Sequence, residues 1–414
     1  MSRLVDTIAP PRLGGAFRWL LASSWVSNFG DGIAIAAGPL LVASQTRDAF
    51  LVALAALVQW LPALLFGLYA GALSDRLDRR RIVVIVDVLR AAVLAVLAAS
   101  IVTDMVSIWF VLAALFVLGT AEVFADNAAH TLLPMLVGRR DLAIANARIQ
   151  AGFITINQLV GPPLGAALFA IGAAWPFVGQ AVLVAAGALL VTRIGQSTRP
   201  REDGERAPIR RDIAEGFRWV RHHPAVRTLV LTIFIFNITF GAAWSVLVLY
   251  ATQRLGVGEV GFGLITTTMA LGGLLGTVTY GWITRRVTLG NLMRIGLIIE
   301  TLTHLGLAAT TSPVVALVIF FVFGVHAFVW GTTSVTVRQR AVPTALQGRV
   351  GSVNTVGVFG GLVVGSAIGG LLARQFGVTA PFWFAFAGSA VFVVLIWREL
   401  AHIAHDDDPI GAAA

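Results

Sequence analysis

Long apolar runs alternate with short polar segments along this chain, and the runs have the length of membrane-spanning helices. A helix needs about 20 apolar residues to cross the hydrocarbon layer. Twelve runs meet this requirement, at residues 18–43, 50–74, 81–103, 107–136, 148–171 and 174–195, and then at 225–250, 260–283, 290–309, 313–337, 350–373 and 378–398. The fourth and tenth runs are longer than a bilayer requires, so we expect these helices to tilt or to project beyond it.

The longest polar segment, residues 196–224, divides the chain into two parts of six spans each. We therefore predict an all-α membrane protein with 12 transmembrane helices in two six-helix bundles, residues 1–195 and 225–414, the second ending in a short cytoplasmic tail. Residues 196–224 form a cytoplasmic linker in this prediction. Within the linker, residues 213–221 place apolar side chains at helical spacing between charges, which predicts a helix along the membrane surface.

The two halves resemble each other in sequence. Matching features recur at a separation of 209 to 211 residues: Phe29-Gly30 with Phe240-Gly241, Gly71 with Gly281, and Pro134 with Pro343. The fifth and eleventh runs carry Gly161-x-x-x-Gly165 and Gly365-x-x-x-Gly369, at a separation of 204. A nearly constant separation predicts pseudo-symmetric bundles, and a parallel repeat of six helices is one architecture of secondary transporters.

Composition excludes several other classes of protein. Residues are 57% hydrophobic and only 12% charged, whereas soluble domains carry about 25% charged residues. The chain has no cysteine, and its 30 basic residues are all arginine. Thiolate metal sites, disulfides and lysine-dependent nucleotide-binding loops are therefore excluded. We expect neither an enzyme nor a bound cofactor or metal.

The arginines predict how the chain is oriented in the membrane. The loops on one side hold only Arg47, Arg254 and Arg374. The other loops hold Arg76, Arg79, Arg80, Arg81, Arg139, Arg140, Arg148, Arg285, Arg286, Arg338, Arg340 and Arg349, together with the arginines of segment 196–224. Arginine-rich loops stay in the cytoplasm. We therefore expect both termini inside a bacterial cytoplasmic (inner) membrane, and the net charge of +9 reflects orientation in the bilayer and not nucleic-acid binding.

The loop after the second run reads Gly71-Ala72-Leu73-Ser74-Asp75-Arg76-Leu77-Asp78-Arg79-Arg80-Arg81. It resembles the signature loop of the major facilitator superfamily, G-x-L-x-D-R-x-G-R-R/K. The resemblance implies a gating role for Gly71, Asp75, Arg76 and Arg79, which in the family lock the cytoplasmic side of the outward-facing state. The alternative is that the arginines only set the orientation. Asp78 stands where the family has glycine, and we expect it to adopt the left-handed conformation that glycine favours there.

A second motif lies in the fifth run. The segment Gly161-Pro162-Pro163-Leu164-Gly165-Ala166 resembles the G-P-x-x-G-G motif of facilitator antiporters, with Ala166 in place of the last glycine. The resemblance implies export in exchange for protons, and the alternative is ordinary packing of small residues. The segments 27–32 and 212–218 resemble the branch that contains macrolide efflux proteins, the enterobactin exporter and mycobacterial multidrug pumps. This resemblance does not identify a substrate. Tryptophans inside predicted spans, Trp25, Trp60 and Trp244, fit a cavity for a bulky apolar or cationic substrate, with packing or lipid-facing roles as the alternative. We expect a monomer in the lipid bilayer whose transport is driven by the proton gradient.

Ionisable residues inside predicted spans are functional candidates, because burying a charge in a bilayer costs at least ~2.5 kcal/mol. Asp31 lies mid-helix between two glycines and is our first candidate for proton coupling or substrate binding. A structural hydrogen bond with Asn28 or a neighbouring helix is the alternative. In the fourth run, Glu122, Asp126 and His130 share one helical stripe. The stripe fits a proton or cation site, an interhelical hydrogen-bond network or, least well, a metal site.

Two further charged pairs are predicted from spacing. Asp87 and Arg90 stand three apart in the third run, which favours a structural ion pair. Glu300 and His304 stand four apart in the ninth run and are predicted to pair, either as a proton relay or as a satisfied buried pair. His326 is isolated in the tenth run and is expected to form a core hydrogen bond. Three functions remain open at this point: a proton-coupled exporter, a metabolite importer or uniporter, and a non-transporting receptor or assembly factor of the same fold.

Overall fold

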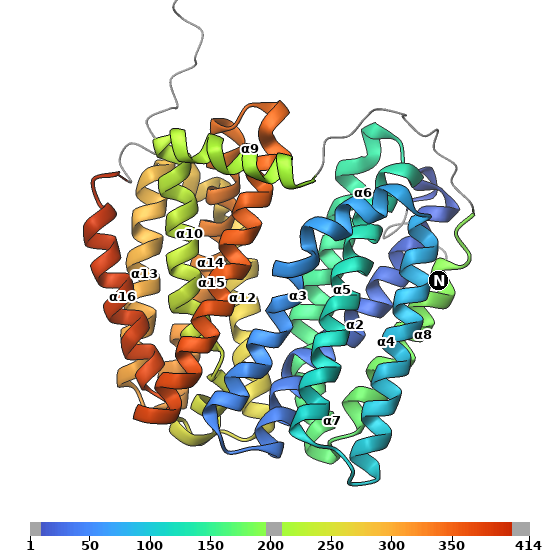
Figure 1. The fold of residues 1–414 in the computed structure, drawn as a ribbon, viewed down its shortest axis with the longest axis horizontal. Coiled ribbons are helices and arrows are strands. Elements are labelled where there is room, and N and C mark those ends of the chain that lie inside the picture. Colours follow the sequence, from blue (N-terminus) through green and yellow to red (C-terminus); the bar gives the residue numbers. More distant parts are fainter. Residues whose placement is uncertain (1–9, 196–208, 400–414) are drawn as a thin grey trace, which may run out of the picture. The chain divides into compact units, whose positions relative to one another are not determined.

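The structure, a computed structural model, describes residues 10–195 and 209–399, without the side chains of 71–76, 139, 209, 210, 212 and 345. The chain is helical throughout these residues (Figure 1). The main helices of the first part are α2 (Gly14–Gln45), α3 (Ala49–Arg76), α4 (Arg79–Val102), α5 (Ile108–Leu136), α6 (Leu142–Gly152), η3 (Phe153–Val160), α7 (Gly161–Ile171) and α8 (Trp175–Val191). Those of the second part are α9 (Ile209–His222), α10 (Pro224–Trp244), α11 (Leu247–Leu249), η4 (Tyr250–Arg254), α12 (Glu259–Thr284), α13 (Leu289–Ala309), α14 (Pro313–Ala341), α15 (Gln347–Phe376) and α16 (Ala380–Ile396).

The number of spans agrees with the apolar runs. In the described part of the chain, ten helices are long and apolar enough to cross a membrane. Two shorter apolar helices, α8 and α16, have 17 residues each and occupy the positions of the predicted sixth and twelfth spans. At 1.5 Å per residue they reach about 26 Å, close to the thickness of the hydrocarbon layer. The predicted fold class is confirmed, and α5 and α14, expected to be long, have 29 residues each.

Polar side chains cap the helices where apolar runs begin. Ser107, Thr288 and Ser312 accept hydrogen bonds from backbone N–H groups in the first turns of α5, α13 and α14, which satisfies donors that a helix start leaves free. Asp78 does the same for α4, accepting from the N–H groups of Arg80 and Arg81. Its φ is −67°, so the expected left-handed conformation was wrong. Aspartate suits this position because its carboxylate caps the start of α4, and glycine has no side chain that could do so.

The fifth span is interrupted by a wider, π-helical turn. The eight residues of η3 separate α6 from α7. Pro162 and Pro163 follow directly and have no N–H group, so the carbonyls of Gln158 and Leu159 lose their usual helical donors. Wider turns are common at such points. The Leu159 carbonyl accepts instead from Thr267 Oγ1 at 3.4 Å.

The seventh span is shorter as a regular helix than expected. The apolar run extends to residue 250, but α10 ends at Trp244. Val246 leaves the helical region with φ −113° and ψ 14°, and Ser245 Oγ donates to the carbonyl of Ala242 at 3.0 Å. A serine hydroxyl that bonds the backbone in this way competes with the helical pattern, and the chain continues through the short α11 and η4.

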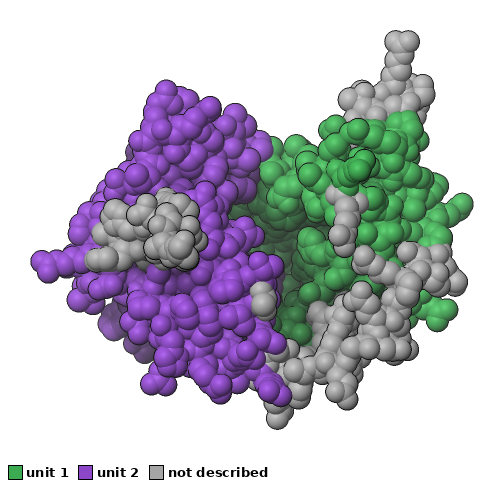
Figure 2. Space-filling model, turned by 90° about the horizontal axis from the view of Figure 1, so that it is seen from above, with its two compact units in different colours: residues 1–46, 61–206, 258–267 green, residues 47–60, 207–257, 268–414 purple. Residues whose placement is uncertain are grey.

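The helices pack into two compact units, coloured separately in Figure 2. Unit 1 contains residues 1–46, 61–206 and 258–267, and unit 2 contains residues 47–60, 207–257 and 268–414. The start of α3 therefore belongs to unit 2, and the start of α12 belongs to unit 1. The predicted linker at 196–224 stays a prediction, because residues 196–208 lie outside the described part of the chain.

The sequence repeat reappears as a repeated helix contact. In unit 1, a Cβ atom on Gly165 of α7 would overlap the carbonyl of Ile33 in α2. In unit 2, a Cβ atom on Gly369 of α15 would overlap the carbonyl of Ala242 in α10. Glycine lets two helix backbones approach to this degree in a membrane. Each unit therefore joins the first and fifth helices of its half through the glycines that the repeat aligns.

The helix predicted around residues 213–221 is present as α9, which Figure 1 shows lying across the ends of α10 and α15. Glu215 Oε1 accepts from Arg349 Nη1 of α15 at 2.9 Å. Val220 is buried among the valines of α10, α14 and α15, whereas Phe217 is 63% exposed. One face of α9 is thus fixed to unit 2, and the other carries Phe217 and basic side chains.

Candidate functional site

Asp31 lies in the middle of α2, and its carboxylate contacts side chains from two other helices. Its Oδ1 accepts from Arg90 Nη2 of α4 at 2.5 Å and from Gln180 Nε2 of α8 at 3.2 Å. Arg90 donates through its other terminal nitrogen, Nη1, to Asp87 Oδ1 at 3.1 Å. The side chains of Arg90 and Asp87 are 6% and 4% exposed, whereas that of Asp31 is 21% exposed. A buried guanidinium therefore bridges two carboxylates, and one of these remains accessible.

Local sequence explains part of this arrangement. Asp87 and Arg90 are three residues apart, so they share one face of α4. Gly30 precedes Asp31 and has no side chain, and a Cβ atom there would lie 3.3 Å from Gln180 Cγ. This missing side chain lets α8 come close enough for Gln180 to reach Asp31. Spacing along α4 thus indicates one contact, and packing of α2, α4 and α8 supplies the other two.

The acidic stripe of α5 belongs to the same region. Glu122, Asp126 and His130 have exposed side chains. The charges of Glu122 and Asp126 act on Arg90, and the charge of Asp126 also acts on Asp31. With Asp87, four carboxyl groups interact electrostatically with one guanidinium, so this group of side chains has more acids than bases. Among the described residues, no group of three or more His, Asp or Glu side chains is placed to hold a metal ion.

The antiporter-like motif of α7 packs against the segment of α2 that carries Asp31. A Cβ atom on Gly161 would lie 2.5 Å from the backbone of Gly32, and a Cβ atom on Gly165 would lie still closer to the carbonyl of Ile33, one residue further along α2. Pro162, between the two glycines, is buried. The motif therefore fixes the position of Asp31 relative to α7, while its role in antiport stays a prediction.

We expect Gly165→Ala to destabilise the protein by about 1–3 kcal/mol, because the added methyl group overlaps the Ile33 carbonyl and forces the two backbones apart. Gly67→Ala is the matched control, since no atom lies within 4 Å of a Cβ atom there. Alanine is a better helix former than glycine by about 1 kcal/mol, so the control is expected to be neutral or stabilising. Chemical unfolding of both purified variants tests this, and an equal response in the two would contradict the packing argument.

The predicted pair of Glu300 with His304 is not formed, although both residues are buried in α13. The partner of Glu300 is His326 of α14, whose Nε2 lies 3.6 Å from Glu300 Oε2. His304 is 0% exposed, and neither of its ring nitrogens has a hydrogen-bond partner in the described residues. It packs edge-on against Trp244, with ring centroids 6.0 Å apart. Helix spacing correctly placed Glu300 and His304 on the same buried side of α13. The histidine that contacts Glu300, however, is His326 of the neighbouring α14.

Of the four gating-loop residues, only Arg79 has a described side chain. Its Nη1 lies 2.8 Å from Met135 Sδ of α5. Gly71, Asp75 and Arg76 form the end of α3, but their side chains lie outside the described part, so the gating role stays a prediction. Arg80 donates to the carbonyl of Thr192, which ties the start of α4 to the end of α8.

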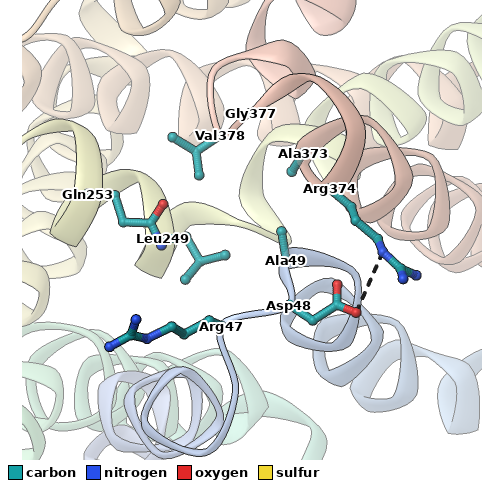
Figure 3. A pocket seen from close by; sticks show the side chains of 9 residues that line it. All are labelled: Arg47, Asp48, Ala49, Leu249, Gln253, Ala373, Arg374, Gly377 and Val378. Carbon is teal, nitrogen blue, oxygen red and sulfur yellow. Dashed lines mark ion pairs between the residues drawn. The ribbon is translucent and has the colours of Figure 1, made fainter.

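The pocket in Figure 3 lies elsewhere, in unit 2. It has a volume of about 340 Å³. Its lining comes from the start of α3 and the residues before it, from the ends of α11 and η4, and from the end of α15 and the residues after it. It comprises Arg47, Asp48, Ala49, Leu249, Gln253, Ala373, Arg374, Gly377 and Val378. Arg374 Nε lies 3.7 Å from Asp48 Oδ2, and Arg47 points away from this pair. None of the acids that the sequence nominated lines this pocket.

Sequence reasoning missed two polar residues that contact α2, Gln180 and Asn157, and it missed the partner of His326. Gln180 is a buried amide within an otherwise apolar sixth run, and that isolation is a signal that could have identified it. Asn157 of η3 donates from Nδ2 to the carbonyl of Asn28 at 3.1 Å, linking the π-helical turn to the helix of Asp31. His326 was treated as isolated, because its partner lies on another helix.

Repeated bundles of apolar helices, with a charged group buried inside one of them, define a polytopic helical membrane protein. The chain belongs to the transmembrane secretion effector family of major facilitator transporters, whose family model matches residues 6–409.

The relatives are named as efflux pumps. The chain is 30% identical over 396 residues to the multidrug efflux pump Tap of Mycolicibacterium fortuitum, covering 89% of this chain and 91% of that protein. It is 23% identical over 365 residues to macrolide efflux protein A of Streptococcus pyogenes, covering 85% and 87%. The family and these relatives are transporters and not enzymes, so the chain is a multi-pass membrane transporter of small molecules.

Solved structures agree with this fold. The nucleoside transporter NupG superposes with a TM-score of 0.73 at 14% identity, over 94% of this chain and 99% of that one. A bacterial homologue of the iron transporter ferroportin gives 0.72 at 16% identity, over 93% and 98%. At such identities the likeness establishes the fold alone.

Proposed function

We propose that the protein exports drugs or siderophore-like small molecules in exchange for protons, by alternating access of its two halves. The observation that carries the proposal is the group of Asp31, Arg90 and Asp87, with Glu122 and Asp126 acting on the same guanidinium. The names of the multidrug and macrolide efflux relatives support export. The glycine-proline motif beside Asp31 supports antiport.

In this proposal, proton and substrate are exchanged because both compete for one accessible carboxylate, that of Asp31. Ionised Asp31 is held by Arg90, and protonation removes the charge that holds it. Arg90 would then shift toward Asp87 or Glu122, since a buried guanidinium needs a charged partner. A cationic substrate competes with the proton for the same acidic group. Binding of one would release the other, which couples the two fluxes in opposite directions.

Energy and orientation are part of the same proposal. The proton gradient drives transport, and no bound cofactor takes part. The arginine-rich loops and both termini face the cytoplasm of a bacterial inner membrane, and a monomer contains the full transport path. The substrate is bulky and either apolar or cationic.

Efflux measurements across a panel of macrolides and other drugs test the function. Cells that express the protein should accumulate less of at least one compound, and a proton uncoupler should abolish the difference. Inverted vesicles should release protons when that compound is added. Uptake that the protein accelerates, with no uncoupler-sensitive efflux, would favour the importer reading, and no gradient for any compound would favour a receptor or assembly factor.

Asp75→Asn tests the gating role. Loss of the carboxylate should slow transport while leaving insertion and yield unchanged, because the arginines that set orientation remain. Asp48→Asn, which removes an acid of the Figure 3 pocket, is the control for loss of one carboxylate at a helix end. Rates are measured as drug-induced proton release at equal protein per vesicle. Normal transport by Asp75→Asn would contradict the gating role and would mean that the loop of residues 71–81 only sets the orientation of the chain in the membrane.

A further inference from the structure

A groove of about 650 Å³ lies between α13 and α16 at one end of unit 2. Its lining residues are Ile298, Val393, Val394, Leu395, Trp397 and Arg398. Val394 and Leu395 are 76% and 72% exposed, so the apolar wall is open to its surroundings. On a membrane-spanning helix, an exposed apolar wall faces lipid, and a concave wall has room for an acyl chain.

A basic side chain is fixed at the rim of this groove. Arg294 Nη2 donates to the carbonyl of Trp397 at 3.0 Å, and its guanidinium lies 5.1 Å from the centre of the Trp397 ring. Arg398 lines the groove directly. Arg294 belongs to the second turn of α13, and Arg398 follows the last residue of α16 by two positions. One end of the groove is therefore lined by Trp397 and Arg398, and the guanidinium of Arg294 lies against the same tryptophan.

The order of side chains along both helices matches the order of groups in a phospholipid. Ile298 lies one turn further along α13 than Arg294, and Val394 lies one turn before Arg398 on α16, about 6 Å in each case. Going inward from the end of the helix pair, charge therefore comes first and apolar surface second. The helices are tightly packed beneath the groove, because Leu297, Val393 and Ile396 belong to one buried hydrophobic cluster.

We propose that this groove binds an anionic phospholipid, with its phosphate at Arg294 and Arg398 and an acyl chain along Ile298 and Val394. Guanidinium groups form strong charge-assisted hydrogen bonds with phosphate oxygens. Tryptophan is enriched at the level of the headgroups, and basic side chains there attract anionic lipid. The site is independent of the proposed transport reaction, because none of its residues belongs to the group around Asp31.

Lipid retention by the full-length protein tests this proposal. The protein is reconstituted in nanodiscs of phosphatidylglycerol and phosphatidylcholine, released into mild detergent and examined by native mass spectrometry. We expect retained phosphatidylglycerol in the wild type and roughly tenfold less in Arg294→Gln/Arg398→Gln, since each basic residue near the surface contributes measurably to anionic-lipid binding. Arg286→Gln is the matched control, because Arg286 stacks on Trp282 at 4.1 Å and lines neither this groove nor the pocket of Figure 3.

Two further measurements test the lipid site on the wild-type protein, so that they do not depend on how the double variant folds. A phosphatidylglycerol with a photoreactive acyl chain should label peptides covering residues 289–302 and 391–399 of the wild type, which requires no variant to fold. Equal retention in the double variant and the Arg286→Gln control, or labelling confined to other helices, would overturn the proposal. Displacement of the lipid by millimolar inorganic phosphate alone would also overturn it, because the site would then recognise free phosphate and not a lipid.

Discussion

Arg90→Leu is expected to destabilise the protein by about 3–5 kcal/mol and to abolish transport. The guanidinium is almost completely buried, and it contacts Asp31 at 2.5 Å and Asp87 at 3.1 Å. Removing one partner of a buried ion pair leaves the other charge uncompensated, and the penalty is of this order. Denaturant unfolding of the purified protein measures the first effect, and drug-induced proton release measures the second.

Two comparisons separate this prediction from a general effect of losing an arginine. Arg12→Leu removes a pair with Asp141 in which the arginine is 60% exposed, so we expect a change of at most about 1 kcal/mol. The triple variant Asp31→Asn/Asp87→Asn/Arg90→Leu removes all three charges and should regain most of the stability lost by Arg90→Leu, but not transport. A single Arg90→Leu variant as stable as Arg12→Leu would show that the contacts do not form as described.

The fold followed from the sequence because bilayer physics leaves few choices. Apolar runs of about 20 residues have to be helices, since backbone groups find no water in hydrocarbon. The glycine repeats of the first and fifth helices then indicated that the two halves are related, whereas the contact between these helices was found in the structure. The interruption at η3 was not predicted, although Pro162 and Pro163 were noticed, because the width of the compensating turn depends on the helix that supplies a new donor. Here that donor is Thr267 of α12.

The functional groups were less predictable than the fold, because their contacts join residues far apart in the chain. The pair of Asp87 with Arg90 lies within one helix and could be expected from spacing. The contact of Arg90 with Asp31 depends on how α2 and α4 pack, and that of Glu300 with His326 depends on α14. Single-helix patterns identify which residues are costly to bury, but they do not identify the partners that make burial tolerable.

The repeat adds a comparison between the two charged groups. Arg90 and Glu300 are each the twelfth residue of their helices, which begin at Arg79 and Leu289. The third helix of each half therefore buries one ionisable side chain at the same level, with opposite sign. The position that corresponds to Asp31 in the second half is Ala242, at the separation of 211 that relates Gly30 to Gly241. At these corresponding positions, the first half has a buried cation beside a partly exposed acid and the second half does not, which is why we assign proton exchange to the first half.

Asp31→Asn is therefore expected to reduce uncoupler-sensitive efflux to the level of membranes without the protein, while expression and stability stay near those of the wild type. An amide oxygen still accepts hydrogen bonds from Arg90 and Gln180, so the local packing is preserved. What the variant loses is the ability to gain and release a proton, and with it the competition between proton and substrate. Proton release from inverted vesicles on addition of substrate measures this loss directly.

Asp31→Glu and Gln180→Ala complete the test. Glutamate keeps the titratable carboxyl group on a longer side chain and should retain part of the exchange, whereas Gln180→Ala removes one donor and should weaken transport without stopping it. Proton-driven efflux at the wild-type rate in Asp31→Asn would contradict the assignment. The proton would then have to bind at Glu122 or Asp126, the remaining exposed acids of the group, and the same measurement on Glu122→Gln and Asp126→Asn would show which of them exchanges it.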